Sequence, residues 1–367
     1  MQTDRPSSAP GLRLMEYTEG ELEALRLLLR GESVIDWHRL HFADLDQVDR
    51  FLRVNEIDPA SERDLFRLDE MRADAVAYLR RALGYRIGRE VAETVPVRDL
   101  FLLASRAAPH AAEACVVLKV MHVMHHLAGR ELLFKLPVSD DEIFHLVEGK
   151  VVKVVEDLRG AGYPVVEFAW GRKRRDSLIT KLLAKRATIA AHIYDKLRFR
   201  LVTRRREDVL PLLRELVQRL IPFNYVIPGE SVNGLVPLDD WMEQKAQPRA
   251  PQPEAVPEAV PEAAAPPAIL NEFSGPDFRI VSFVADLPVR LDDFIANASE
   301  ALWEEYGSVV FVLTEFQVVD VATAARNETG ENSHERYKAR QHTQVRERLA
   351  DDGELEVNTD PDDGMGG

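Results

Sequence analysis

The chain has 367 residues, of which 46% are hydrophobic, and its formal net charge is −15. This length allows two domains or one elaborated domain, and the apolar fraction is sufficient for a substantial core. The single cysteine, Cys115, cannot form an internal disulfide, which excludes a disulfide-rich extracellular scaffold. We find no apolar signal sequence and no apolar run of about 18 residues, so we expect a cytoplasmic protein without a membrane partner.

The sequence pattern of the first third of the chain predicts helices. Residues 1–19 are expected to be flexible, and residues 20–135 form an α-helical N-terminal region in which apolar residues recur at helical spacing. In its last helix, His122, His125 and His126 can share one face. Zinc could bind such a face, but no HExxH pattern or cysteine completes a site, so we favour structural histidines.

Residues 136–345 follow a different pattern, in which strands alternate with helices. Ser139 and Glu142 form a capping box at the start of a helix that ends near Gly160. The later helices are expected at 176–193, 207–221, 291–307 and about 324–349. The strands are expected before Gly171 and at 196–202, 277–289 and 308–320. This order is typical of an α/β or α+β domain, and the long apolar strand 308–320 is expected to be central.

Two segments are expected to be disordered. Residues 244–267 consist mainly of proline, alanine and glutamate, and they interrupt the second domain. Residues 350–367 contain seven acidic residues and no basic one. Neither composition supports a packed core.

The stretch from Arg172 to Arg206 is strongly basic. It contains thirteen Lys or Arg and two acidic residues, a local charge of +11 against −26 for the rest of the chain. Such a positive region attracts polyanions, including nucleotides, nucleic acid or the protein's own acidic tail. Asp195 lies within the stretch and could bind Mg²⁺ (or Mn²⁺) beside phosphates. Alternatively, it caps a strand or pairs with an arginine.

A second carboxylate, Glu315, lies within an apolar strand and shares a face with Gln317. An ionisable group in such a strand costs several kcal/mol unless a cation, metal or proton compensates it. Glu315 therefore either pairs with an arginine such as Arg198 or Arg200, or meets Asp195 around Mg²⁺.

Three motifs in chain order resemble the synthetase domain of RelA/SpoT-type alarmone synthetases. The first is a basic segment followed by an Asp-led strand, the second is an E-x-Q strand, and the third is an E-x-G-x-x-x-H-x-x-Y-K block. The matching residues are Lys173, Ser177, Lys181, Asp195, Arg200, Glu315, Gln317, Glu328, Gly330, His334, Tyr337 and Lys338.

The resemblance implies an α+β fold with a nucleotidyltransferase-like mixed β-sheet flanked by helices. It also implies transfer of the β,γ-diphosphate of ATP to the 3′-hydroxyl of a guanine nucleotide. Asp195 and Glu315 would be the catalytic and metal-binding residues, and Glu315 could instead accept the hydroxyl proton. The implied nucleotide-binding residues are Arg172, Lys173, Ser177, Lys181, Arg198, Arg200, Gln317, Phe278 and His334.

The chain departs from the family pattern around the acceptor. The stretch Gly-Tyr-Gln-Ser-x-His is absent; its counterpart contains Phe278, which could stack a base, and has Ser282 at the His position. Val319 and Asp320 stand where an Arg follows E-x-Q. A different acceptor, such as another nucleotide or a tRNA end, is therefore open. So are an inactive nucleotide sensor and an RNA-binding surface at residues 172–206. The oligomeric state is open as well.

Overall fold

The protein is described from a computed structural model. The described residues are 17–32, 40–173, 175–184, 196–237, 275, 277–292 and 300–349. The predicted disordered segments, 244–267 and 350–367, lie outside these residues, as does most of the predicted flexible start. None of the described helices is both long and apolar enough to cross a bilayer.

The N-terminal region is helical, as predicted. Its main helices are α1 (Glu19–Arg30), α2 (Leu45–Val54), α3 (Glu62–Leu83), α4 (Val97–Ser105) and α5 (Ala111–Lys135). α1 begins at a capping box formed by Thr18 and Glu21. It ends at Gly31, whose φ of 63° is the left-handed conformation that glycine adopts without a steric penalty.

The second part combines strands and helices. Its helices are α6 (Asp140–Gly160), α7 (Arg175–Ala184), α8 (Val209–Arg219), α10 (Glu300–Tyr306), α11 (Val321–Asn327) and α12 (His334–Leu349). Its strands are β1 (Val165–Arg172), β2 (Leu197–Thr203), β3 (Val232–Asn233), β4 (Val281–Arg290) and β5 (Val309–Asp320). The predicted capping box at the start of α6 is confirmed, because Ser139 Oγ accepts from the Glu142 amide and Glu142 accepts from the Ser139 amide.

The C-terminal helix predicted at about 324–349 is instead two helices. A short 3₁₀ helix, Gly330–Asn332, separates α11 from α12. Gly330 has a φ of 59°, which a right-handed helix cannot accommodate. The prediction of one continuous helix was wrong, and the break falls inside the E-x-G-x-x-x-H-x-x-Y-K block.

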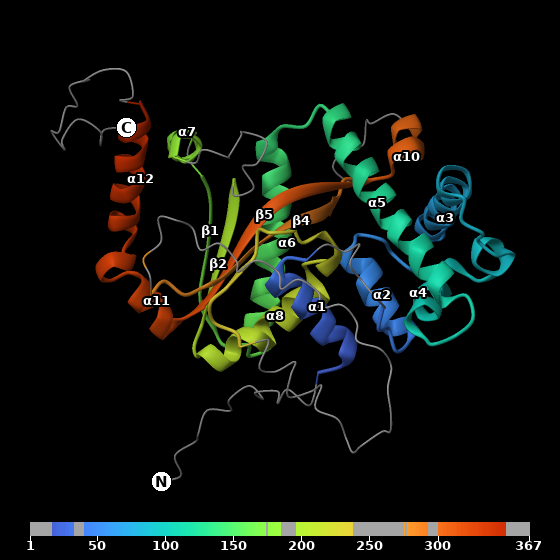
Figure 1. The fold of residues 1–367 in the computed structure, drawn as a ribbon, viewed down its shortest axis with the longest axis horizontal. Helices are drawn as coiled ribbons and strands as arrows, with labels where there is room; N and C mark the ends of the chain where they lie inside the picture. The colour runs from blue at the N-terminus through green and yellow to red at the C-terminus, as the bar shows by residue number, and fades with distance from the viewer. Residues whose placement is uncertain are drawn as a thin grey trace, which may run out of the picture.

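The described strands form one five-stranded sheet with the order β1-β2-β5-β4-β3. β5 is central, as predicted. It pairs in parallel with β2 and antiparallel with β4, and β1 pairs antiparallel with β2 (Figure 1). The α+β fold class with a mixed sheet flanked by helices is therefore confirmed.

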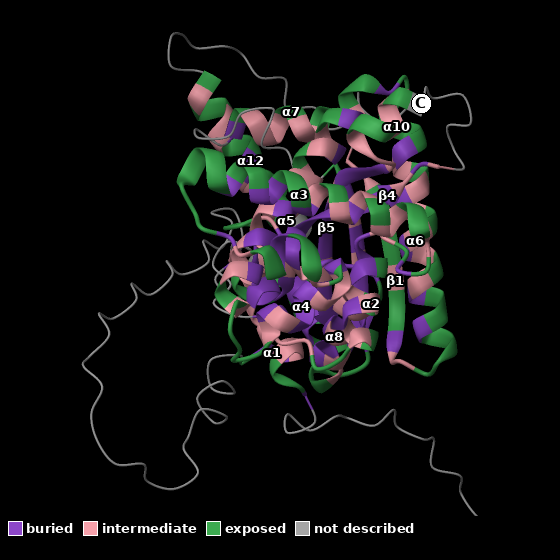
Figure 2. Cartoon of the chain, turned by 90° about the vertical axis from the view of Figure 1, so that its right-hand side faces the viewer, coloured by how far each residue is buried: buried purple, intermediate pink, exposed green. Residues whose placement is uncertain are grey.

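Alternation along β5 separates its side chains onto two faces. Val312, Phe316 and Val318 belong to the apolar face, which shares a buried core with leucines and valines of α1, α6 and α8. Four rings stack across this face on neighbouring strands, in the order Phe168, Phe199, Phe316 and Phe283. Figure 2 shows the resulting contrast between buried β5 and largely exposed β1.

The other face of β5 is covered by α5 where the strand begins. Gly129 of α5 lies so close to β5 that an added Cβ would meet the Phe311 ring at 2.5 Å and the Val309 carbonyl oxygen at 2.6 Å. A residue without a side chain is therefore required at this crossing. Further along the same face, Glu315 and Gln317 follow.

We predict that Gly129→Ala destabilises the protein by about 1–3 kcal/mol, because the added methyl group overpacks the helix–strand contact. Chemical denaturation of the purified protein measures this loss. Gly149→Ala is the matched control, since Gly149 is also helical but a Cβ added there would meet nothing within 4 Å. Equal stability of the Gly129→Ala variant and the wild type would contradict the close crossing.

Candidate functional site

The sheet register gathers polar side chains on the face of β5 that carries Glu315. Arg198 of β2 lies opposite Glu315, and Arg200 lies opposite Gln317. From the other side, Ser282 of β4 also lies opposite Gln317. Because directly opposite residues point to the same face, these five residues form one surface, which we call the polar face.

Glu315 is the most buried member of the polar face. Its Oε2 accepts from Arg198 Nε at 2.7 Å, and its Oε1 accepts from Gln317 Nε2 at 2.8 Å and from Ser282 Oγ at 3.3 Å. Burial alone would raise the pKa of Glu315, but Arg198, Lys173 and the Gln317 hydrogen bond outweigh it and lower that pKa. The arginine pair foreseen as the alternative to a metal is thus present, with Arg198 as the partner.

Arg200 has unused hydrogen-bonding capacity. Its Nε is buried and has no hydrogen-bond partner within the described part of the chain, and its Nη2 reaches Glu328 Oε1 only at 3.5 Å. A buried donor without a partner is unfavourable unless a ligand or water accepts from it. Arg200 is therefore suited to an anion that binds the polar face.

The other predicted phosphate-binding residues come from the end of β1 and from α7. Lys173 lies close enough to Glu315 to lower its pKa. Ser177 and Lys181 lie on α7, which packs beside α12 (Figure 1). Asp195 lies outside the described residues. His334 begins α12, but its side chain is not among those described.

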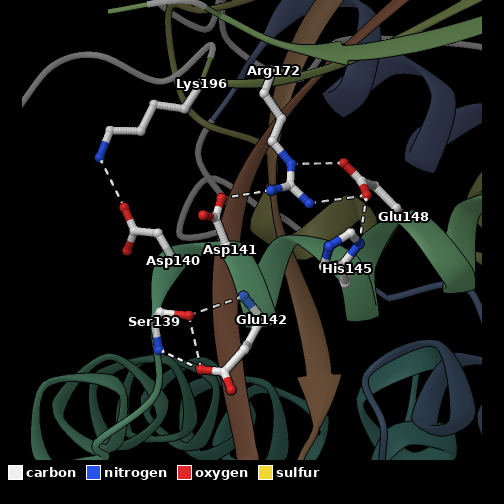
Figure 3. Close-up of polar contacts among 8 residues, drawn as sticks. All are labelled: Ser139, Asp140, Asp141, Glu142, His145, Glu148, Arg172 and Lys196. Atoms are coloured by element: carbon white, nitrogen blue, oxygen red, sulfur yellow. Dashed lines mark hydrogen bonds and ion pairs between the residues drawn. The ribbon is translucent and has the colours of Figure 1, made fainter.

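Arg172 is separated from the polar face. It lies opposite Leu197, which is fully buried in the core, so it points to the face opposite Arg198. There its guanidinium donates to Glu148 at 2.9 Å and to Asp141 at 2.6 Å, both on α6 (Figure 3). This strand alternation places Arg172 on the other face of the sheet from Glu315, and its role in phosphate binding stays a prediction.

Lys196 is paired in the same way as Arg172, because its Nζ lies 3.3 Å from Asp140 (Figure 3). The acidic first turn of α6 therefore neutralises part of the basic stretch. The positive charge that remains near Glu315 is smaller than the sequence suggested.

Phe278, predicted to stack a base, is partly buried and packs against the main core. The neighbouring Arg279 is fixed by Asn327 of α11, whose side chain bonds both the amide and the carbonyl of Arg279 at 3.2 and 2.7 Å. The segment before β4 is therefore attached to α11.

The three histidines of α5 pack against the aromatic rings of Tyr225 and Phe311. His122 stacks on Tyr225, and burial lowers the pKa of His122 to about 3 and that of His125 to about 4. His126 Nε2 lies 2.7 Å from Asp286 Oδ2. No group of three or more potential ligands occurs within the described residues.

Asp286 was missed by the sequence analysis. It is buried on β4, on the same face as Glu315, and among the residues that the structure describes its Oδ1 has no hydrogen-bond partner. An acidic residue inside an apolar strand is the signal that identified Glu315, and the same signal applies to Asp286.

Comparisons with known proteins give structural matches only. No family model matches the chain, and no curated protein matches it.

Three of the similar solved structures are alarmone synthetases or related proteins. Small alarmone synthetase 1 from Bacillus subtilis is 14% identical with a TM-score of 0.29, and the match covers 57% of this chain and 89% of that one. A GTP pyrophosphokinase family protein from Streptococcus pneumoniae is 13% identical with a TM-score of 0.30, covering 56% and 83%. Small alarmone synthetase 2 from Bacillus subtilis is 12% identical with a TM-score of 0.29, covering 57% and 96%. At these values the matches assign no function to this chain.

We predict that Arg198→Met lowers the free energy of unfolding at pH 7 by about 1–3 kcal/mol, because Glu315 loses its charged partner. In the wild type the folded-state pKa of Glu315 lies below its unfolded value. The stabilisation is therefore complete above about pH 4.3 and is lost as the pH falls through the folded-state pKa. Denaturation curves should show the difference between variant and wild type shrinking as the pH is lowered.

Arg205→Met is the control, because Arg205 lies in an exposed turn after β2 and its side chain is 65% exposed. This variant should be close to the wild type at every pH. A pH-independent loss for Arg198→Met would show that its cost comes from packing and not from the charge of Glu315.

Proposed function

We propose that the chain is a divergent RelA/SpoT-like pyrophosphotransferase. It would move the β,γ-diphosphate of ATP to the 3′-hydroxyl of a nucleotide acceptor, either a guanine nucleotide or another. The main support is the polar face itself, where Arg200 and Glu315, taken from two separate sequence motifs, lie on adjacent strands of one sheet. The Nε of Arg200, unpartnered within the described residues, adds a donor for an anionic ligand.

The reaction requires cations on the transferred group and a proton acceptor. Arg200 and Lys173 would bind ATP phosphates, with Ser177 and Lys181 of α7 contributing from the side. The acceptor 3′-oxygen attacks the β-phosphorus, the bond from the β-phosphorus to the α,β-bridging oxygen breaks, and AMP leaves. Glu315 would receive the hydroxyl proton. Catalysis of this kind depends mostly on positioning and on charge stabilisation.

Magnesium is compatible with the residues of the polar face. Mg²⁺ bound to nucleotides typically takes one or two carboxylates together with phosphate oxygens. In this alternative role Glu315, once released from Arg198, would hold the ion and would not accept the proton, and Asp195, outside the described residues, would be the second carboxylate. The ion would neutralise phosphate charge when bound.

A second candidate is a nucleotide sensor that binds but does not transfer. It is favoured by the partners of Glu315, whose two oxygens are both engaged by side chains of the polar face. A carboxylate with a lowered pKa is a weak base. Transfer therefore requires that ligand binding releases Glu315 from Arg198.

We predict that the protein transfers label from γ-labelled ATP to an acceptor in the presence of Mg²⁺ or Mn²⁺. The acceptor panel contains guanine nucleotides, other nucleotides and tRNA, and products are separated by chromatography. Glu315→Gln should reduce the rate by about 10²–10⁴-fold, because it removes the proton acceptor. Arg200→Gln should weaken ATP binding about tenfold or more, since a charge-assisted hydrogen bond is lost.

Arg205→Gln is the control and should leave both quantities unchanged. Tight ATP binding without transfer in any acceptor mixture would favour the sensor. Salt-sensitive RNA binding that is indifferent to Glu315→Gln and Arg200→Gln would favour the RNA-binding surface and contradict both nucleotide proposals.

A further inference from the structure

A cavity lies between helices α1, α2 and α8, and no residue of the polar face lines it. Its volume is about 110 Å³. Most of its wall is apolar, with contributions from each of the three helices and from the segment after α8. The apolar lining includes Ala24, Leu25, Leu27, Phe51, Val217 and Phe223.

The acidic side chains that line this cavity are already paired. Glu21 accepts from Arg214 at 2.6 Å and from Gln218 at 2.5 Å. Glu23 accepts from Arg26 Nε and Nη2, each at 2.8 Å. These carboxylates therefore leave no uncompensated negative charge in the described wall.

Arg50 of α2, unlike these paired carboxylates, is a charged residue of the cavity wall whose charge is not compensated within the described residues. It also lines the cavity, it is exposed, and within the described residues it forms no hydrogen bond or ion pair. An exposed residue that lines a cavity lies where the cavity meets solvent. The cavity consequently combines an apolar interior with one uncompensated positive charge at its mouth, as far as the described residues show, and this combination complements an amphipathic anion.

We propose that this cavity binds a small aliphatic carboxylate, with its hydrocarbon tail inside and its carboxylate on Arg50. An engineered apolar cavity of about 150 Å³ holds benzene, so the smaller volume here fits a tail of about four or five carbons. The guanidinium matches the geometry of a carboxylate, which can accept two parallel hydrogen bonds. This site does not depend on the proposed transfer reaction.

Two of the helices that form the cavity also pack against the sheet. α1 and α8 bury leucines, including Leu28 and Leu213, in the same core cluster that contains Phe316 of β5. A ligand that fills the cavity adds contacts between α1, α2 and α8. Binding therefore stabilises the N-terminal helices against the layer that supports the polar face.

The test uses the full chain and pentanoate, with pentanol and pentylamine as probes of equal tail length. Saturation-transfer NMR titrations measure binding to the wild type, Arg50→Gln, Arg53→Gln and Ala24→Phe. Arg53 is the matched control because it is an exposed arginine on the same helix that does not line the cavity. Circular dichroism establishes that each variant is folded, and Val217→Phe replaces Ala24→Phe if that variant is not.

Pentanoate should bind the wild type and Arg53→Gln with a dissociation constant of about millimolar order. Arg50→Gln should weaken pentanoate about five- to tenfold and bring it level with pentanol, because the charge-assisted contact is removed. The filled cavity should bind none of the three probes. The proposal is overturned if the wild type does not bind pentanoate, if pentanol or pentylamine binds equally well, or if binding survives Arg50→Gln or the filling substitution unchanged.

Discussion

The close packing of α5 on the start of β5 determines which part of this sheet face is covered and which part carries polar side chains. Gly129 allows the helix backbone to approach Phe311 and Val309 within a distance that no side chain could occupy. At this end of the face, Val309 and Phe311 of β5 are therefore buried under α5. Two alternations beyond Phe311 the same face carries Glu315, where polar side chains replace the packing that α5 provides.

The charged side chains of the polar face are tolerated at a partly buried position because opposite charges on neighbouring strands pair with each other. The register brings Arg198 to Glu315, and the hydrogen bonds from Gln317 and Ser282 complete the environment of the carboxylate. The same alternation sends Arg172 to the opposite face, where α6 supplies its acidic partners. A single basic run in the sequence thus becomes two groups with different surroundings. Of the β1 and β2 arginines, those that share the face of Glu315 are the ones assigned to the proposed site.

The sequence predicted the elements whose signals are local. Capping residues indicated the start of α6, and an apolar run indicated β5 as the central strand. The direction of Arg172 could not be predicted, because it depends on the β1–β2 register. Asp286 could have been identified from its apolar strand, whereas its partner His126 could not, because that contact joins α5 to β4 across 160 positions. The sequence showed that Ser282 replaces the family's histidine. The hydrogen bond from Ser282 to Glu315 could not be predicted, because it depends on the register of β4 against β5.

The environment of Glu315 links anion binding to proton affinity. Burial raises the pKa of this carboxyl, and the positive charges of Arg198 and Lys173 hold it below its ordinary value. A polyphosphate bound to these cations would offset their charge, while the burial would remain or increase. The pKa of Glu315 would then rise towards the range of an effective base. Under the proposed function, a carboxylate that is a weak base in the unliganded protein becomes a stronger one when the nucleotide arrives. This coupling requires the Arg198 contact to be exchanged and not merely retained. The same pair that stabilises the empty sheet would therefore set the order of events, with phosphate binding preceding proton transfer.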